Sequence, residues 1–143
     1  MKTVKQVLDT KGYQLHSVQP DTSVYDALQK MAREEIGALA VLDGGELAGI
    51  LSERDYARKV ILKGLHSKDT PVSDIMTRNV ICVTSEIGVD ACMSLMTDKH
   101  VRHLMVRDAE RLSGVISIGD VVKAIIEDQR FTIEQLEHYI SGG

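Results

Sequence analysis

The chain contains an internal duplication. A shift of 65 positions aligns residues 18–62 with residues 83–127 without a gap. Residues identical in both copies are mostly apolar or typical of turns, namely Val18/Val83, Val24/Val89, Met31/Met96, Leu39/Leu104, Val41/Val106, Asp43/Asp108, Leu47/Leu112, Gly49/Gly114, Ser52/Ser117 and Asp55/Asp120. Chance identity would not favour such positions so consistently. The duplication predicts two copies of one supersecondary unit.

Each copy has the pattern of a βαββα unit. Apolar residues first recur at helical spacing, at Val24, Ala27, Leu28 and Met31 and again at Val89, Cys92, Met93 and Met96. Ser23 or Thr22 is a suitable cap for the first of these helices. Two short apolar strands joined by a tight turn follow, at 38–42 and 47–51 in the first copy and at 104–106 and 112–116 in the second. Helical spacing then returns, and a short extended segment precedes each copy.

The predicted fold class is therefore mixed α/β (α+β), with two βαββα repeats related by a pseudo-twofold axis and short helices at both ends. A unit of about fifty residues buries too little apolar surface to be stable alone, so we expect the repeats to pack sheet to sheet around a shared core. The predicted divisions are 1–15 (N-terminal helical segment), 16–62 (first repeat), 63–79 (linker), 80–127 (second repeat) and 128–143 (C-terminal helix).

The segment 128–143 is expected to be a separate helix with its own cap and its own buried face. Thr132 is the expected N-cap, and the expected buried stripe consists of Phe131, Leu136, Tyr139 and Ile140.

Composition excludes some functions. The net charge of −4 gives no support for a nucleic-acid-binding face or a membrane-surface patch. The first residues lack the apolar core of a signal peptide, and the apolar runs are too short to span a bilayer. Cys82 and Cys92 lie in apolar segments without a CxxC pattern, which predicts reduced core residues of a cytoplasmic protein.

The phrase "GILSERD" (49–55) returns as "GVISIGD" (114–120), and it permits two interpretations. Ser followed by Asp three residues later, between a strand and a helix, is close to a capping box, and a duplicated domain duplicates its caps. The same geometry suits a ligand, because a helix N-terminus favours phosphate and a carboxylate can accept from the two hydroxyls of a ribose. Arg54 adds a cation in the first copy, where the second has Gly119.

The stretch 16–127 resembles a tandem pair of CBS (cystathionine-beta-synthase) domains, a Bateman module. The segments that carry the resemblance are "VQPDTSVYDALQKM", "GALAVLDGGELAGILSERD", "VSDIMT", "MTDKHVRHLMV" and "LSGVISIGD". The chain is also similar to bacterial proteins that consist of a CBS pair alone and are assigned to signal transduction; some share "ERDYARKV" and a helix like "FTIEQLEHYI". It departs from the family where the Pro of "RHLPV" is replaced by Met105, and by Ala40 in the first copy.

The resemblance implies clefts between the repeats that bind adenosine ligands. AMP is the first candidate, with ADP, ATP, NAD(H) and S-adenosylmethionine as alternatives. In the family's pattern the Asp holds ribose, the Ser and nearby Arg or His hold phosphate, and residues of the first two strands enclose adenine. The implied binding residues are Val18, Gln19, Gly37, Ala38, Leu39, Ser52, Arg54, Asp55, Val83, Thr84, Arg102, His103, Leu104, Ser117 and Asp120.

The expected function is non-catalytic regulation. Neither a nucleophile–base arrangement nor a pair of catalytic carboxylates can be assembled, and no metal is expected because His100 and His103 lack a third ligand. We expect a homodimer, since the family's pairs stack through their helices, with an unknown protein as a further partner. Because only the first copy has Arg54, the two sites should differ. The alternatives are a ligand-free dimerisation module and a nucleic-acid-binding regulator, which the acidic charge disfavours.

Overall fold

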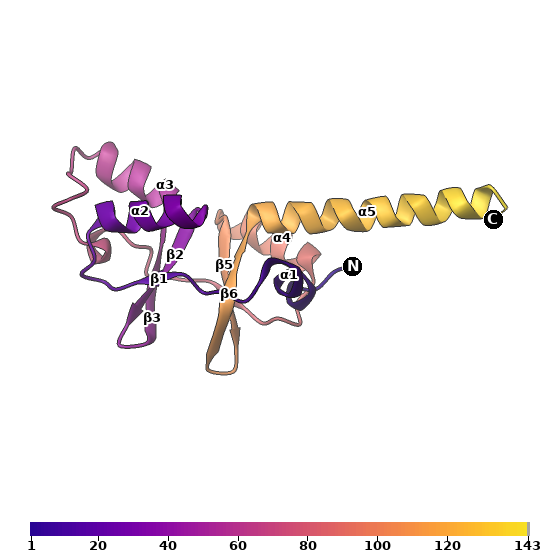
Figure 1. Ribbon diagram of the computed structural model, residues 1–143, viewed down its shortest axis with the longest axis horizontal. Helices are drawn as coiled ribbons and strands as arrows, with labels where there is room; N and C mark the ends of the chain where they lie inside the picture. The colour runs from indigo at the N-terminus through magenta and orange to yellow at the C-terminus, as the bar shows by residue number, and fades with distance from the viewer. Residues whose placement is uncertain (143) are drawn as a thin grey trace. The chain divides into compact units, whose positions relative to one another are not determined.

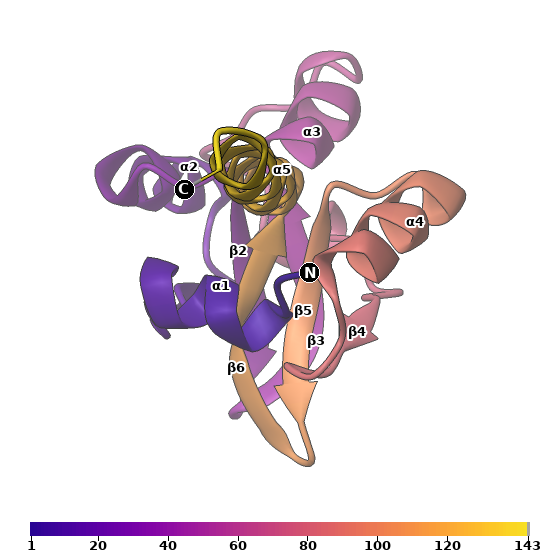
Figure 2. The same cartoon turned by 90° about the vertical axis from the view of Figure 1, so that its right-hand side faces the viewer.

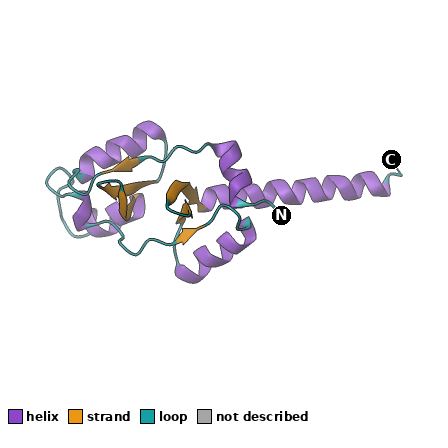
Figure 3. Ribbon diagram, turned by 90° about the horizontal axis from the view of Figure 1, so that it is seen from below, coloured by secondary structure: helices purple, strands orange, loops and turns teal. Residues whose placement is uncertain are grey.

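The computed structural model describes residues 1–142, and the chain forms two compact units. The middle unit is the continuous stretch Leu15–Val80, and the terminal unit combines Met1–Gln14 with Ile81–Gly143. Each unit contains one three-stranded sheet and its own helices. Figure 3 shows the strands in orange and the helices in purple. The predicted mixed α/β class is confirmed.

The middle unit has the predicted βαββα order (Figure 1). Its elements are β1 (Ser17–Val18), α2 (Val24–Glu34), β2 (Ala38–Asp43), β3 (Glu46–Ser52) and α3 (Glu53–Tyr56), followed by a π-helical turn, Ala57–Ile61, and a 3-10 turn, Val72–Asp74. Strand β2 is central; β1 pairs with it in parallel and β3 antiparallel. Ser23 caps α2 as predicted, because its side chain accepts from the Asp26 backbone N–H at 3.1 Å.

The terminal unit repeats this topology and adds a helix at its start. Its elements are α1 (Val4–Lys11), β4 (Cys82–Val83), α4 (Val89–Lys99), β5 (His103–Asp108), β6 (Arg111–Ser117) and α5 (Ile118–Ile140). Strand β5 is central, with β4 parallel and β6 antiparallel to it. Figure 2 shows α1 beside β6, within the same unit.

Each unit has its own cluster of buried apolar residues, and the expected sheet-to-sheet packing of the repeats stays a prediction. In the middle unit Val24, Leu39 and Leu51 are fully buried in one cluster. In the terminal unit Leu8 and Leu104 belong to another. A unit this small reaches its own core because a segment from outside the predicted repeat packs onto it.

These additional segments, residues 2–8 and 70–76, are equivalent, and we call them the lead segments. Val72 donates its backbone N–H to the Thr22 carbonyl at 2.8 Å, and Val4 donates to the Ile87 carbonyl at 2.9 Å. Thr22 and Ile87 are aligned positions of the duplication (87 − 22 = 65). The 70–76 lead segment therefore docks on the first repeat, and the 2–8 lead segment docks on the second.

Further hydrogen bonds repeat the same pairing. Ser73 donates to the Pro20 carbonyl at 2.9 Å, and Lys5 donates to the Ser85 carbonyl at 2.8 Å, so both acceptors are again aligned positions. The lead segments are shifted by 68 positions (72 − 4) rather than 65. The N-terminal helical segment is thus part of the second repeat unit and not an appendage outside the pair.

The lead segments explain the glycine that opens each repeated phrase. A Cβ on Gly49 would lie 2.7 Å from the Thr77 carbonyl oxygen and 2.8 Å from the Met76 sulfur. A Cβ on Gly114 would lie 3.1 Å from Leu8 Cδ2. The Thr77 backbone leaves no room for a side chain at Gly49, whereas at Gly114 the end of the Leu8 side chain would have to shift, so both glycines serve close packing and not a special backbone conformation.

The structure corrects the prediction of a separate C-terminal helix. Helix α5 is continuous from Ile118 to Ile140, so Thr132 is not an N-cap; its hydroxyl donates to the Asp128 carbonyl at 3.0 Å inside the helix. The expected buried stripe is exposed, with relative exposures of 63% at Phe131 and 84% at Tyr139; Leu136 and Ile140 are exposed as well. Residues 129–142 are all exposed.

The two cysteines differ, although both were predicted to be core residues. Cys92 is fully buried in the cluster of the terminal unit, which confirms the prediction for that residue. Cys82 is exposed. Successive side chains of a strand point to opposite faces, and in β4 the inward position is taken by Val83, so Cys82 faces outward.

Candidate functional site

The repeated Ser and Asp form a capping box in both units. In the middle unit the Asp55 backbone N–H donates to Ser52 Oγ at 3.1 Å, and the Ser52 backbone N–H donates to Asp55 Oδ2 at 3.0 Å. Ser117 and Asp120 make the same two bonds at 3.1 and 2.9 Å. The structural interpretation of the phrase is confirmed. It also holds each carboxylate in one orientation at the junction of a strand and a helix.

The capping arrangement already uses part of each helix N-terminus. The Glu53 backbone N–H donates to the Gly37 carbonyl at 3.1 Å, and the Ile118 N–H donates to the Arg102 carbonyl at 2.9 Å. The third N–H of each helix is bonded to the capping serine. A phosphate at either junction would therefore depend on side-chain cations more than on the helix terminus.

Asp55 is buried and surrounded by donors from the protein. Its residue exposure is 8%, and Oδ2 accepts from both the backbone N–H and the hydroxyl of Ser52 at 3.0 Å. Its Oδ1 accepts from Thr77 Oγ1 at 3.1 Å and forms an ion pair with Lys59 Nζ at 3.0 Å. Both oxygens are engaged, so a ribose could bind here only by replacing Thr77 or Lys59.

Asp120 is more open, and a lysine from α1 holds it. Lys11 Nζ lies 2.6 Å from Asp120 Oδ2 and 2.8 Å from the Val115 carbonyl oxygen. The side-chain exposure of Asp120 is 23%, against 10% for Asp55. Burial raises the pKa of the Asp120 carboxyl, but hydrogen bonds from Lys11 and Ser117 and the charge of Lys11 outweigh it and hold the pKa below its ordinary value.

Lys11 takes the place that Thr77 has in the middle unit. Thr77 donates its backbone N–H to the Ile50 carbonyl at 2.9 Å and its hydroxyl to Asp55. Lys11 makes both equivalent contacts with its ammonium, because Val115 and Asp120 are the aligned positions (115 − 50 = 65; 120 − 55 = 65). The chain segment following each lead segment thus contributes a donor to the carboxylate.

Sequence analysis missed Lys11, Lys59 and Thr77. The apolar pattern of "VKQVL" (4–8) matches that of "VSDIM" (72–76), which was an available sign that the two segments are equivalent. The donors that follow these segments, Lys11 and Thr77, are different residue types and lie 66 positions apart (77 − 11) rather than 68. A comparison of sequence patterns alone would therefore not pair them.

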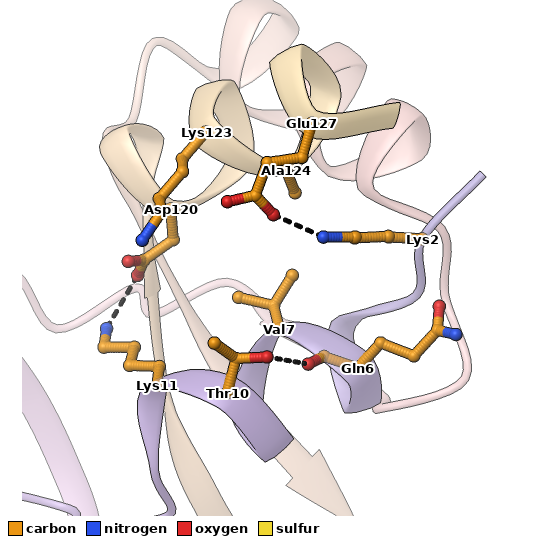
Figure 4. A pocket seen from close by; sticks show the side chains of 9 residues that line it. All are labelled: Lys2, Gln6, Val7, Thr10, Lys11, Asp120, Lys123, Ala124 and Glu127. Atoms are coloured by element: carbon orange, nitrogen blue, oxygen red, sulfur yellow. Dashed lines mark hydrogen bonds and ion pairs between the residues drawn. The ribbon is translucent and has the colours of Figure 1, made fainter. Parts of the chain in front are cut away.

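A pocket of about 190 Å³ lies between α1 and α5 beside Asp120 (Figure 4). Lys2 forms an ion pair with Glu127 at one end, and Lys11 pairs with Asp120 at the other. The full lining consists of Lys2, Gln6, Val7, Thr10, Lys11, Asp120, Lys123, Ala124 and Glu127. Three lysines face two carboxylates, so the lining carries one excess positive charge.

Each set of sequence-predicted site residues lies within one unit. The middle unit holds Val18, Gln19, Gly37, Ala38, Leu39, Ser52, Arg54 and Asp55, and the terminal unit holds Val83, Thr84, Arg102, His103, Leu104, Ser117 and Asp120. Ala38 pairs with Ser52 across β2 and β3, and His103 pairs with Ser117 across β5 and β6.

The accessibility of these residues differs. Gln19, Thr84 and Arg102 are exposed, whereas Leu39 and Leu104 have 0% exposure. Leu39 and Leu104 belong to the core clusters of their own units and, as the structure stands, offer a ligand no surface. Recognition at either junction would rest on the Ser–Asp pair, on the surrounding cations and on the edges of the strands.

Residues 1–142 contain neither a metal-binding cluster nor a membrane-spanning helix. Among them, no three His, Cys, Asp or Glu side chains gather as a metal site would require. None of the helices in this range has both the length and the apolar content needed to cross a membrane.

Sequence comparison matches the chain to known proteins over nearly its whole length. A family model described as CBS domain matches residues 4–62 and 72–127. The CBS domain-containing protein CBSX3, mitochondrial, of Arabidopsis thaliana is 42% identical over 150 residues, covering 99% of this chain and 73% of that protein. Both family matches begin at equivalent positions of the lead segments, Val4 and Val72, in agreement with the equivalence seen in the structure.

Solved structures have the same fold. A protein with CBS domains from Burkholderia ambifaria MC40-6 superposes with a TM-score of 0.86 at 48% identity, covering 90% of this chain and 96% of that chain. The CBS-domain containing protein ATU1752 from Agrobacterium tumefaciens superposes with a TM-score of 0.80 at 41% identity, covering 86% and 98% of the two chains.

Proposed function

Because the chain belongs to the CBS domain family and contains two copies of the domain, we propose that it is a non-catalytic regulatory module that binds adenosine ligands. One observation carries this proposal: each unit holds a carboxylate at a strand–helix junction, oriented by a capping serine and paired with a lysine. When a ligand binds, the lysine can release the aspartate and contact the ligand instead. The aspartate can then accept hydroxyl donors from a ribose.

The two carboxylates differ in how many protein contacts a ligand has to displace. A ribose at Asp55 has to displace Thr77 or Lys59 from a side chain that is 10% exposed. At Asp120, which is 23% exposed, it has to displace Lys11. We infer that a ligand enters the Asp120 site with less rearrangement. The expectation that the sites differ stands as a prediction.

Adenosine is supported as the ligand class by a neighbour in structure. The CBS domain pair of protein MJ0100, with a TM-score of 0.76 and 24% identity, was solved in complex with 5'-methylthioadenosine and S-adenosyl-L-methionine. For the present chain, cations suggest a different preference within that class. Lys2, Lys11 and Lys123 line the pocket beside Asp120, so a phosphorylated nucleoside such as AMP or ADP fits better than a sulfonium.

Self-association is the second candidate function, and α5 favours it. Val122, Ile126, Ile133, Leu136 and Ile140 fall at the spacing of one coiled-coil seam, with Gln129 at the remaining position. Each of the five apolar residues is at least 41% exposed. We propose a homodimer that uses this seam, in addition to ligand binding. A cytoplasmic location and the involvement of an unknown protein partner also remain predictions.

Calorimetry with adenosine, AMP, ADP, ATP, NADH and S-adenosylmethionine tests the proposed ligand class. Wild-type protein should bind at least one adenine compound, and ribose 5-phosphate should not replace it. Asp120→Asn should abolish one class of site and Asp55→Asn the other, because each replaces one of the two acceptor oxygens and the negative charge with an NH₂ donor. Asp98→Asn, which makes the same charge change at an exposed position in α4, is the matched control.

Mass spectrometry of protein purified without added ligand complements this test. A retained adenine nucleotide supports the proposal. Co-purified nucleic acid would favour the regulator alternative, and failure of every adenine compound to bind would leave self-association as the function of the module.

A further inference from the structure

Lys11 links the N-terminal helix to the carboxylate of the second phrase. Its ammonium has two acceptors within the terminal unit: Asp120 Oδ2 at 2.6 Å and the Val115 carbonyl at 2.8 Å. The side chain is 38% exposed, so it is only partly shielded from water. We propose that Lys11 is a specificity-determining residue of the Asp120 site, which makes that site select phosphorylated nucleosides over neutral ones. This inference rests on the proposed function.

The selection follows from the exchange that binding requires. A ribose that takes Asp120 removes the only carboxylate in contact with Lys11 among residues 1–142. A neutral nucleoside leaves the ammonium with the Val115 carbonyl and water. Loss of an ionic partner from a partly buried charge is unfavourable, whereas a phosphate on the same ligand replaces the lost anion. The phosphate thus compensates for the ion pair that the ribose breaks.

The surroundings of Lys11 suit an anion. Figure 4 shows Lys123 extending from α5 toward Asp120, while Lys2 lies at the far end of the pocket in its ion pair with Glu127. A ribose is neutral and leaves the charges of the lining unchanged, so three lysines still face two carboxylates, with one positive charge in excess. The cavity of about 190 Å³ is far larger than the roughly 10–15 Å³ that one water needs by the same kind of measure, so it has room for a phosphate group.

Lys11 also changes what the sequence implied about the second site. Gly119 occupies the position of Arg54, so the sequence allowed either a weaker affinity for phosphate or room for a larger ligand at the second site. The structure brings a cation to the same carboxylate from the other end of the chain, 109 positions away. In the middle unit the corresponding lysine, Lys59, comes from the fourth residue after Asp55 and also donates to the Ile75 carbonyl at 3.0 Å.

The test is the ratio of AMP to adenosine affinity at the Asp120 site, measured by calorimetry. That site is identified as the one lost in Asp120→Asn. In wild-type protein AMP should bind at least tenfold more tightly than adenosine. Lys11→Met keeps the aliphatic stem and removes the charge, so the ratio should fall by about ten- to a hundredfold, the worth of a charge-assisted hydrogen bond. Adenosine alone should bind the variant more tightly than it binds the wild type.

Two matched variants complete the experiment. Lys11→Arg keeps the cation and should preserve the ratio. Lys5→Met removes a lysine from the exposed face of the same helix, where it pairs with Asp9, and should change nothing. Should Lys11→Met prove unfolded by circular dichroism, Lys11→Gln takes its place with the same expected loss of discrimination.

The outcomes separate this inference from the function on which it rests. If AMP and adenosine both bind and Lys11→Met leaves their ratio unchanged, Lys11 is not a selector, and the proposed function stands. If no adenine compound binds either the wild type or the variants, the proposed function is wrong and the selectivity falls with it.

Discussion

Lys11 and Asp120 are separated by 109 positions in the sequence, and the ammonium nitrogen of one lies 2.6 Å from a carboxylate oxygen of the other. Thr77 and Asp55 have the corresponding relationship in the middle unit, at 3.1 Å and only 22 positions apart. In both units the donor follows a lead segment. The carboxylates of the repeated phrase are therefore connected to segments that lie outside the repeats as the sequence delimits them.

The Lys11–Asp120 ion pair makes the free energy of unfolding depend on pH in the acidic range. The pKa of Asp120 is lower in the folded protein than its unfolded value of about 3.9, so its contribution is fully present above that value. The contribution is lost as the pH falls through the folded pKa. Urea unfolding between pH 7 and pH 2.5 should show Asp120→Asn less stable than the wild type at neutral pH, with the difference shrinking in acid. A difference independent of pH would contradict the ion pair.

Three glycines predict three different responses to alanine. Gly49→Ala should destabilise the protein by about 1–3 kcal/mol, because its Cβ would meet the Thr77 backbone at 2.7 Å. Gly114→Ala should cost less, since the neighbour at 3.1 Å is the end of the Leu8 side chain, which can move. Gly119→Ala should stabilise by about 0.5–1 kcal/mol, because it lies in a helix with Ser117 Oγ no closer than 3.6 Å.

Thermal or urea unfolding of the three variants checks this order. An equal loss of stability in Gly49→Ala and Gly114→Ala would contradict this prediction. It would mean that both lead segments move equally easily to accommodate the added methyl group.

The two cysteines should react at different rates. Cys82 is exposed, whereas Cys92 is fully buried in the core of the terminal unit. Burial raises the pKa of the Cys92 thiol, with a smaller effect in the same direction from Asp90, so the reactive thiolate is disfavoured there. A chromogenic disulfide reagent should label one thiol rapidly in native protein and a second only on unfolding. Cys82→Ser should remove the fast phase, and rapid labelling of both thiols would argue against the buried position.

The exposed seam of α5 predicts self-association. Ile133 and Leu136 are 53% and 56% exposed, so serine at both positions should cost the folded monomer little, within about 0.5 kcal/mol. The same double variant should shift the mass measured by light scattering from dimer toward monomer. Gln135→Ser, on the same turns of the helix, is the control and should leave the mass unchanged. A wild-type monomer at micromolar concentration would contradict the proposed dimer.

Local patterns predicted most of the fold. The βαββα order, the cap at Ser23 and both capping boxes follow from residues close together in sequence, where periodicity and capping chemistry are decisive. The lead segments did not follow from the alignment, because they match at a shift of 68 and the repeats at 65. The exposure of Cys82 depends on which face of strand β4 points toward the core. In a strand of two residues the alternation of apolar and polar positions is too short to indicate that face.

The candidate site was only half predictable. Ser52, Asp55, Ser117 and Asp120 follow from the repeated phrase itself. Lys11 could not be found in this way, because its contact with Asp120 depends on the docking of α1 and not on any local spacing. Leu39 and Leu104 were expected to contact a ligand, and that role stays a prediction; their complete burial could not be foreseen, because an apolar strand residue has the same pattern whether it lines a site or the core.

The docking of the first lead segment also has a consequence for the order of folding. The middle unit is one continuous stretch, so all of its contacts are available once residue 80 has left the ribosome. The terminal unit joins the first 14 residues to residues 81 and beyond, and α1 has its core partner Leu104 only after most of the chain is made. Residues 1–14 are thus synthesised well before the segment on which they dock, and a long loop has to close before the two parts of the terminal unit can meet.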